Sequence, residues 1–248
     1  MNISILLPSR GRPDSAKSAI NKLFALAAQP EQVEVIIRTD NDDPKVAQYQ
    51  ALTSDNIKVI VGESHGYVGI WRYFEECYNV SRGQVVVDYI DDAEMETPGW
   101  DSLYLSAAKS NPLAAISSHI SSPSEGRDRH YRWALPACSR TLYEHSLMKQ
   151  LPDPGLALIT SRDRVWDAYA EASGQEIQAD VWITHYYTES TPGNPRGDYY
   201  AHVRAHWSEF IPRWRQAGEG IMKNAGISPC KISWLRMKRR LRKLFSPT

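Results

Sequence analysis

Four short apolar runs separated by helical segments fill the first part of the chain, and they constrain its fold more than any other feature. The runs span residues 3–8, 33–37, 57–61 and 84–90. Between them, apolar residues recur three and four positions apart, as in amphipathic helices that bury one face. Strands that alternate with helices are joined by parallel crossovers, so we predict an α/β fold with a mostly parallel, Rossmann-like sheet and helices on both faces.

The second half of the chain is less regular. We predict strands at residues 114–118 and 179–184, and helices at residues 141–149 and 163–172. Residues 121–132 are polar and predict a loop. At 248 residues the chain is long enough for one large domain followed by a short tail.

Composition narrows the functional classes. Lys+Arg and Asp+Glu both number 29, so no global charge attracts nucleic acid or an anionic surface. The three cysteines are widely spaced, which argues against a disulfide framework or a structural zinc site and favours a reducing cytoplasm. No apolar run approaches the roughly 18 residues of a membrane span, so any membrane contact would be peripheral.

Ligands of parallel α/β sheets bind beyond the carboxyl ends of the strands, which directs attention to the loops that follow the apolar runs. Residues 38–44 follow the second run and form an acidic loop that we do not expect in the core. The fourth run is followed directly by Asp91, Asp92, Ala93 and Glu94. Adjacent carboxylates repel one another unless a cation neutralises them, and a hard divalent ion such as Mg or Mn does so while bridging diphosphate oxygens. A solvated acidic turn is the alternative interpretation.

These loops, taken in order, resemble those of the GT-A glycosyltransferases of the family-2 type. The first run ends in Pro-Ser-Arg-Gly-Arg-Pro (residues 8–13), the second in Asp40, the fourth in Asp91-Asp92, and a Pro-Gly-Trp segment (residues 98–100) opens the next helix. The resemblance implies a nucleotide-sugar donor, a UDP-sugar above all, bound by Pro8, Ser9, Arg10, Arg12, Asp40, Asp42 and Asp91.

The resemblance continues more loosely to about residue 190. It implies that Asp91, Asp92 and His185 hold the metal and that Asp163 is the general base of an inverting hexosyl or pentosyl transfer. Two departures bear on these roles. Ala93 stands where many members have the last aspartate of the motif, which leaves Asp92 by itself or with Glu94, and Arg162 replaces the usual glutamate beside Asp163.

The resemblance divides the chain into a nucleotide-sugar-binding half (residues 1–110), an acceptor-binding half (residues 111–210) and a basic helical tail (residues 211–248). An Arg- and Trp-rich loop at residues 127–133 would face the acceptor. The tail would suit a membrane surface and an envelope or lipid-linked saccharide, or the phosphates of DNA and a modified base as acceptor, or simple packing on the domain. An inactive GT-A-like module that binds nucleotides or glycans is the alternative function.

Overall fold

The computed structural model describes residues 1–66, 69–121, 135–145, 159–186 and 207–227. The strands are β1 (Ile3–Pro8), β2 (Val33–Asp40), β3 (Ile57–Gly62), β4 (Val85–Asp88), β5 (Ala93–Met95), β6 (Ala115–Ser121), β7 (Ala137–Ser139) and β8 (Glu176–His185). The helices are α1 (Pro13–Leu26), α2 (Val46–Gln50), α3 (Ile70–Val80), α4 (Trp100–Ser110), α5 (Arg140–His145), α6 (Ile159–Ser173) and α8 (Trp207–Asn224), with a 3₁₀ turn at Pro30–Gln32.

These strands form one sheet in the order β3-β2-β1-β4-β7-β6-β8-β5. β1, β2, β3 and β4 are mutually parallel, and β6 is parallel to β8. The short strands β7 and β5 run antiparallel to their neighbours. The predicted mostly parallel α/β sheet is confirmed.

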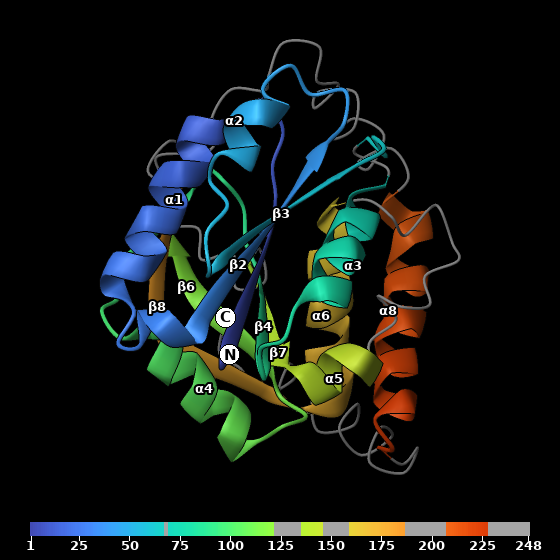
Figure 1. The fold of residues 1–248 in the computed structure, drawn as a ribbon. Helices are drawn as coiled ribbons and strands as arrows, with labels where there is room; N and C mark the ends of the chain where they lie inside the picture. Colours follow the sequence, from blue (N-terminus) through green and yellow to red (C-terminus); the bar gives the residue numbers. More distant parts are fainter. Residues whose placement is uncertain (67–68, 122–134, 146–158, 187–206, 228–248) are drawn as a thin grey trace.

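Each face of the sheet has its own hydrophobic cluster. Ile3, Ile5 and Leu7 of β1 belong to the cluster that includes α1 and α4, whereas Leu6 belongs to the cluster that includes α3, α5, α6 and α8. Figure 1 shows these two groups of helices on opposite sides of the strands. Because β1 is covered on both faces, its sequence is an unbroken apolar run rather than an alternating one.

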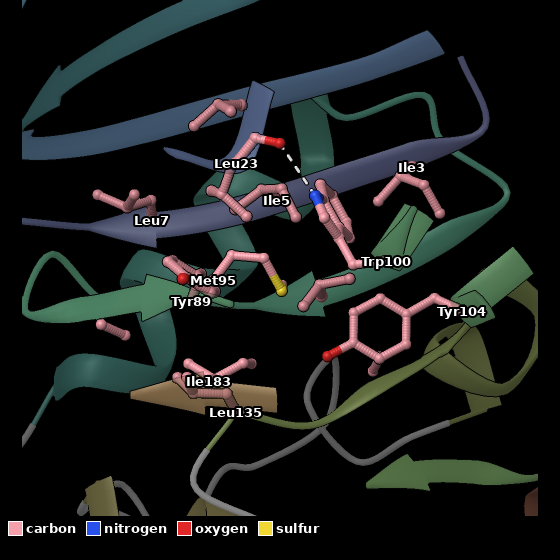
Figure 2. Packing of buried hydrophobic residues seen from close by; sticks show 14 of the residues in the cluster. Ile3, Ile5, Leu7, Leu23, Tyr89, Met95, Trp100, Tyr104, Leu135 and Ile183 are labelled. Atoms are coloured by element: carbon pink, nitrogen blue, oxygen red, sulfur yellow. Dashed lines mark hydrogen bonds between the residues drawn. The ribbon is translucent and has the colours of Figure 1, made fainter. Parts of the chain in front are cut away.

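The start of α4 is fastened to the end of α1. Trp100 is fully buried and donates a hydrogen bond from its indole Nε1 to the carbonyl of Leu23 at 2.9 Å, as Figure 2 shows. The Asp101 carboxylate accepts hydrogen bonds from the backbone N–H groups of Ala28 and Gln29 at 2.8 and 3.0 Å. Gly99 precedes them with a φ of 71°, a conformation that favours glycine. The Pro-Gly-Trp segment thus ties α4 to the C-terminal end of α1.

The structure differs from the sequence predictions mainly in its short elements. β5 and β7 have three residues each and were not predicted. β2 extends to Asp40, so Arg38, Thr39 and Asp40 are buried strand residues. The expectation that the acidic segment 38–44 lies outside the core was wrong for these three residues and for Asp43, and it holds for the exposed residues Asn41, Asp42 and Pro44.

Helix α8 packs beside α6, and its residues Trp214, Ile221 and Met222 are buried in the second cluster. The predicted tail begins within this helix, and its basic part, residues 228–248, lies outside the described residues. None of the described helices is both long enough and apolar enough to cross a membrane.

Candidate active site at the carboxyl edge of the sheet

The carboxyl ends of β1, β2 and β4 bring the predicted site residues Ser9, Asp40 and Asp91 to one edge of the sheet. Ser9 follows β1, and its backbone N–H donates to the carbonyl of Arg38 in β2 at 2.9 Å. Its hydroxyl donates to the Asp91 carboxylate at 2.5 Å and lies 2.7 Å from the Tyr49 hydroxyl. Parallel pairing of β1 with both neighbours thus places the loops after β1 and β4 in direct contact.

Asp91 and Asp92 are buried, with 3% and 8% of their surfaces exposed. The Arg12 guanidinium bridges them: Nη2 lies 2.5 Å from Asp91 Oδ1, and Nη1 lies 3.1 Å from Asp92 Oδ2. Arg12 comes from the loop that precedes α1, where Pro13 occupies the first helical turn. A solvated acidic turn is excluded by this burial.

Pairing of β8 with the unpredicted strand β5 places His185 beside Asp92. Ala93 pairs with His185 across the antiparallel β5–β8 ladder, and the Tyr186 N–H donates to the Asp92 carbonyl at 2.8 Å. His185 is buried, and its Nε2 lies 3.4 Å from Asp92 Oδ1. Ala93 is itself a core residue, which explains why no third aspartate stands there. Glu94, the next residue along β5, points to the opposite face of the strand from Ala93.

Burial and neighbouring charges shift the pKa values of Asp91 and Asp92 in opposite directions. Burial raises the pKa of Asp91 to about 6, against the lowering effects of the Arg12 charge and the Ser9 hydrogen bond. Burial would also raise the pKa of Asp92, but His185 and Arg12 together outweigh it and lower that pKa. The fold therefore disfavours the charged form of Asp91 and favours the charged form of Asp92.

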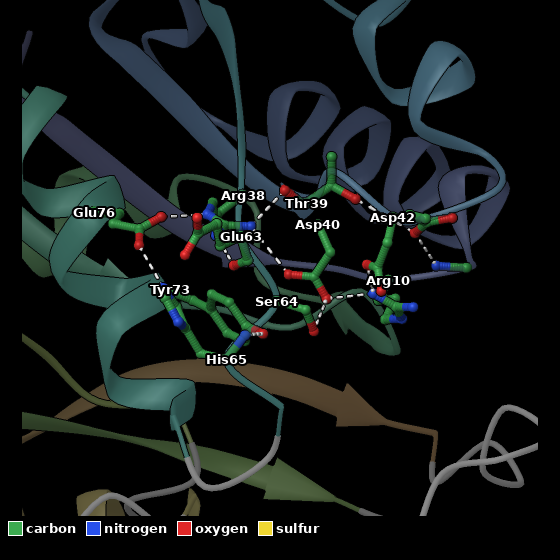
Figure 3. A network of polar contacts seen from close by, with 12 residues as sticks. Arg10, Arg38, Thr39, Asp40, Asp42, Glu63, Ser64, His65, Tyr73 and Glu76 are labelled. Atoms are coloured by element: carbon green, nitrogen blue, oxygen red, sulfur yellow. Dashed lines mark hydrogen bonds and ion pairs between the residues drawn. The ribbon is translucent and has the colours of Figure 1, made fainter.

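A second polar cluster surrounds the end of β2 (Figure 3). Asp40 Oδ2 accepts from Arg10 Nη1 at 2.6 Å and from the Ser64 hydroxyl at 3.1 Å, while its Oδ1 lies 3.2 Å from Arg38 Nη1. Arg10 also forms an ion pair with the exposed Asp42 and lowers the pKa of that carboxyl. The loop between β1 and α1 thus contacts both acidic segments, Arg10 at β2 and Arg12 after β4.

Arg38 is the member of this cluster that the sequence did not place. Its side chain is fully buried, pairs with Glu76 of α3, donates to the Glu63 carbonyl at 2.6 Å and lies over the Tyr73 ring. A Cβ at Gly62 would come within 2.8 Å of Arg38 Nη2, so a larger residue there would displace the guanidinium. His65 completes the chain of contacts through Glu76 at 2.9 Å.

The remaining predicted residues are placed less completely. Pro8 ends β1 opposite Arg38. Asp163 falls within α6, but its side chain lies outside the described residues, as do the Arg- and Trp-rich loop at residues 127–133 and the basic tail. The general-base role of Asp163 therefore stays a prediction.

The donor atoms near Asp92 suit a divalent metal in part. Asp92 and His185 supply a hard oxygen and an imidazole nitrogen, a combination that Mn accepts. Within the described part of the chain, however, no three Asp, Glu, His or Cys side chains are grouped so that they could hold a metal ion. The residues fit a metal whose coordination is completed by oxygen atoms of a ligand.

Comparisons by sequence found no relative. The chain matches no family model, and no curated protein matches it.

Comparisons by structure found clear likenesses. The structure of GalNAc-T7 with UDP, GalNAc and Mn²⁺ aligns over 85% of this chain with a TM-score of 0.59 and 14% identity. This chain covers 49% of it, about half its length. The mannosyltransferase PcManGT from Pyrobaculum calidifontis, with GDP-Man and Mn²⁺, aligns over 99% of this chain and 81% of its own, with a TM-score of 0.55 and 12% identity.

A third likeness is S. aureus TarS residues 1–349 with UDP-GlcNAc, which aligns over 86% of this chain and 71% of its own, with a TM-score of 0.57 and 11% identity. All three identities are low, so the likeness concerns the fold and not the activity. This chain has the GT-A fold that these glycosyltransferases share.

Proposed function

We propose that this chain is a metal-dependent glycosyltransferase that moves a sugar from a nucleotide-sugar, a UDP-sugar in the first instance, to an acceptor hydroxyl. The observation that carries the proposal is the buried Asp91–Asp92 pair at the carboxyl edge of a GT-A sheet, with Ser9 and His185 in contact with it. Solved proteins of this fold are described with UDP, GDP-Man or UDP-GlcNAc, and two of them with Mn²⁺.

The residues divide the binding task between the two acidic segments. Asp40, held by Arg10, Arg38 and Ser64, would receive the nucleoside, and the loop from Pro8 to Arg12 would lie along the diphosphate. Asp92 and His185 would hold the metal, with Asp91 beside them. When bound, the metal supplies positive charge that stabilises the departing nucleoside diphosphate. In this assignment residues 1–110 bind the donor and residues 111–210 bind the acceptor.

The stereochemistry at the anomeric carbon depends on which residue is the general base. An acceptor hydroxyl that loses its proton to Asp163 while it attacks the anomeric carbon gives an inverted product in a single displacement. A saccharide is the acceptor class that we favour, and a modified base in DNA is the other candidate. Incubation with a UDP-sugar and either a lipid-linked saccharide or hydroxymethylated DNA separates the two by where the labelled sugar appears.

Arg12 favours one competing function. Its ion pairs already neutralise part of the charge on Asp91 and Asp92, as expected for a GT-A-like module that binds nucleotides without a metal and without turnover. Release of UDP from a UDP-sugar with Mn²⁺ present, and its absence with a chelator, would support the enzyme. Binding that is indifferent to the chelator, without UDP release, would support the module.

Thermal unfolding tests the proposal directly, because a ligand that binds only the folded state raises the melting temperature. We expect a UDP-sugar to raise it only when Mn²⁺ is present, and the double change Asp91→Asn with Asp92→Asn to abolish that rise. Asp55→Asn is the matched control, since this exposed aspartate lies before β3 at the opposite edge of the sheet. A double variant that responds like the parent would refute the metal assignment.

A further inference from the structure

Arg12 occupies the position between the two aspartates from which a metal ion would neutralise them. One guanidinium nitrogen lies 2.5 Å from Asp91 Oδ1 and another lies 3.1 Å from Asp92 Oδ2. The Arg12 side chain is 32% exposed, whereas the two carboxylate side chains are 1% and 5% exposed. The cation therefore covers buried carboxylates from the solvent side.

The backbone that carries Arg12 is held in place independently of these ion pairs. The Arg12 N–H donates to the Tyr49 hydroxyl at 2.8 Å, and Tyr49 is fully buried and also contacts the Ser9 hydroxyl. One residue earlier, the Gly11 N–H donates to the Asp43 carboxylate at 2.6 Å. The long arginine side chain can therefore change position while the loop stays where it is.

A guanidinium and a divalent cation cannot both lie close to the same two carboxylates without strong repulsion. Asp92 makes this competition concrete, because its Oδ1 faces His185 and its Oδ2 faces Arg12. A metal bound by Asp92 would meet the positive charge of Arg12 unless that side chain had another anion to pair with. The diphosphate of a nucleotide is such an anion, and arginine pairs with phosphate oxygens readily.

We propose that Arg12 is the internal counter-ion of the ligand-free site and that it makes metal binding depend on the nucleotide. The diphosphate draws the guanidinium away from Asp91 and Asp92, and the carboxylates then accept the metal. The inference rests on the proposed function, which identifies the two ligands as a nucleotide and a divalent metal. By linkage, the factor by which nucleotide tightens metal binding equals the factor by which metal tightens nucleotide binding.

The test is the affinity for Mn²⁺, measured by electron paramagnetic resonance of the free ion with and without UDP. We expect the parent to bind Mn²⁺ weakly by itself and more tightly with UDP. Arg12→Gln removes the competing charge, so its affinity for Mn²⁺ without nucleotide should rise by about tenfold, within the usual range of coupling between two sites. The effect of UDP on Mn²⁺ binding should shrink in the same variant.

Two further variants separate competition from a general effect of charge or folding. Arg12→Lys keeps a positive charge near the two carboxylates and should bind Mn²⁺ less tightly than Arg12→Gln. Lys17→Gln removes one positive charge from an exposed position of α1 and should leave the affinity unchanged. A circular dichroism spectrum establishes that each variant is folded before its metal affinity is compared.

The inference is overturned if, without nucleotide, Arg12→Gln binds Mn²⁺ no more tightly than the parent. It is also overturned if Lys17→Gln shows the same increase in Mn²⁺ affinity. The comparison requires no sugar transfer. If Arg12→Gln binds Mn²⁺ more tightly but the parent transfers no sugar, the proposed function is refuted and the counter-ion role of Arg12 still holds.

Discussion

Two acidic clusters lie at the same edge of the sheet, and they are neutralised to different extents. The β2 cluster consists of Asp40, Asp42 and Glu76 with Arg10 and Arg38, and its buried aspartate, Asp40, contacts both arginines. The β4 cluster consists of Asp91 and Asp92 with Arg12 and His185, and its one arginine is shared by both carboxylates. The buried aspartate of the β2 cluster thus has two arginines, whereas the two buried aspartates of the β4 cluster have one between them, which leaves room there for positive charge from a ligand.

The largest expected effect comes from breaking the β2 cluster at its buried cation. Arg38→Met leaves Asp40 and Glu76 without this partner, and we expect the free energy of unfolding to fall by about 3 kcal/mol, the lower end for a buried pair because Glu76 keeps some contact with solvent. Urea unfolding followed by circular dichroism measures it. Arg10→Met, which removes the half-exposed arginine of the same cluster, should cost clearly less, and equal losses would show that burial does not distinguish the two arginines.

The β4 cluster should respond in the opposite direction. The pKa of Asp91 is raised from 3.8 to about 6 in the folded protein, so keeping this group charged above pH 6 costs stability. Asp91→Asn should therefore stabilise the ligand-free protein at pH 8, by at most about 3 kcal/mol at about 1.4 kcal/mol per pKa unit.

The pH dependence supplies the control for this variant. Below about pH 3 the Asp91 carboxyl is protonated in both the folded and the unfolded state, so parent and variant should differ least there. The advantage of Asp91→Asn should grow as the pH rises to 6 and then stay constant. A variant that is less stable than the parent at pH 8 would mean that Arg12 and Ser9 compensate the carboxylate fully.

The smallest effect is expected at the exposed end of the β2 cluster. Asp42 has a side chain that is 59% exposed, and its ion pair with Arg10 is screened by water. Asp42→Asn should leave the urea midpoint unchanged within error, because Arg10 keeps its contact with Asp40. A clear shift would show that the outer ion pair is part of the folded core.

The sequence was sufficient to predict the parts of the fold whose signal is local. β1, β2 and β4 come from apolar runs of the kind that strands buried on both faces require, and their order along the chain implied where their carboxyl ends meet. The contact between Ser9 and Asp91 follows from that geometry. The loops that the family resemblance singled out are the loops that the structure brings together.

The parts that could not be predicted depend on partners far apart in the chain. Arg38 interrupts an apolar strand, and nothing near it in sequence shows that Glu76 of α3 will neutralise it. The three-residue strand β5 has too few residues for a periodic pattern, yet it aligns Ala93 with His185. A histidine at a strand end carries no signal of its own until that pairing is known.

The hydrogen bonds that Trp100 and Asp101 of α4 make at the C-terminal end of α1 have a consequence for the opposite end of α1. This helix has 14 residues and is therefore about 21 Å long. Arg12 lies just before its first turn, the Trp100 hydrogen bond is made within its last turn, and the Asp101 hydrogen bonds lie just beyond it. Fastening the far end of the helix limits how far the helix can slide along its axis, and the hydrogen bonds of Gly11 and Arg12 to Asp43 and Tyr49 hold the near end. Trp100 thus contributes to the position of Arg12 without contacting it, because both residues are attached to the same helix.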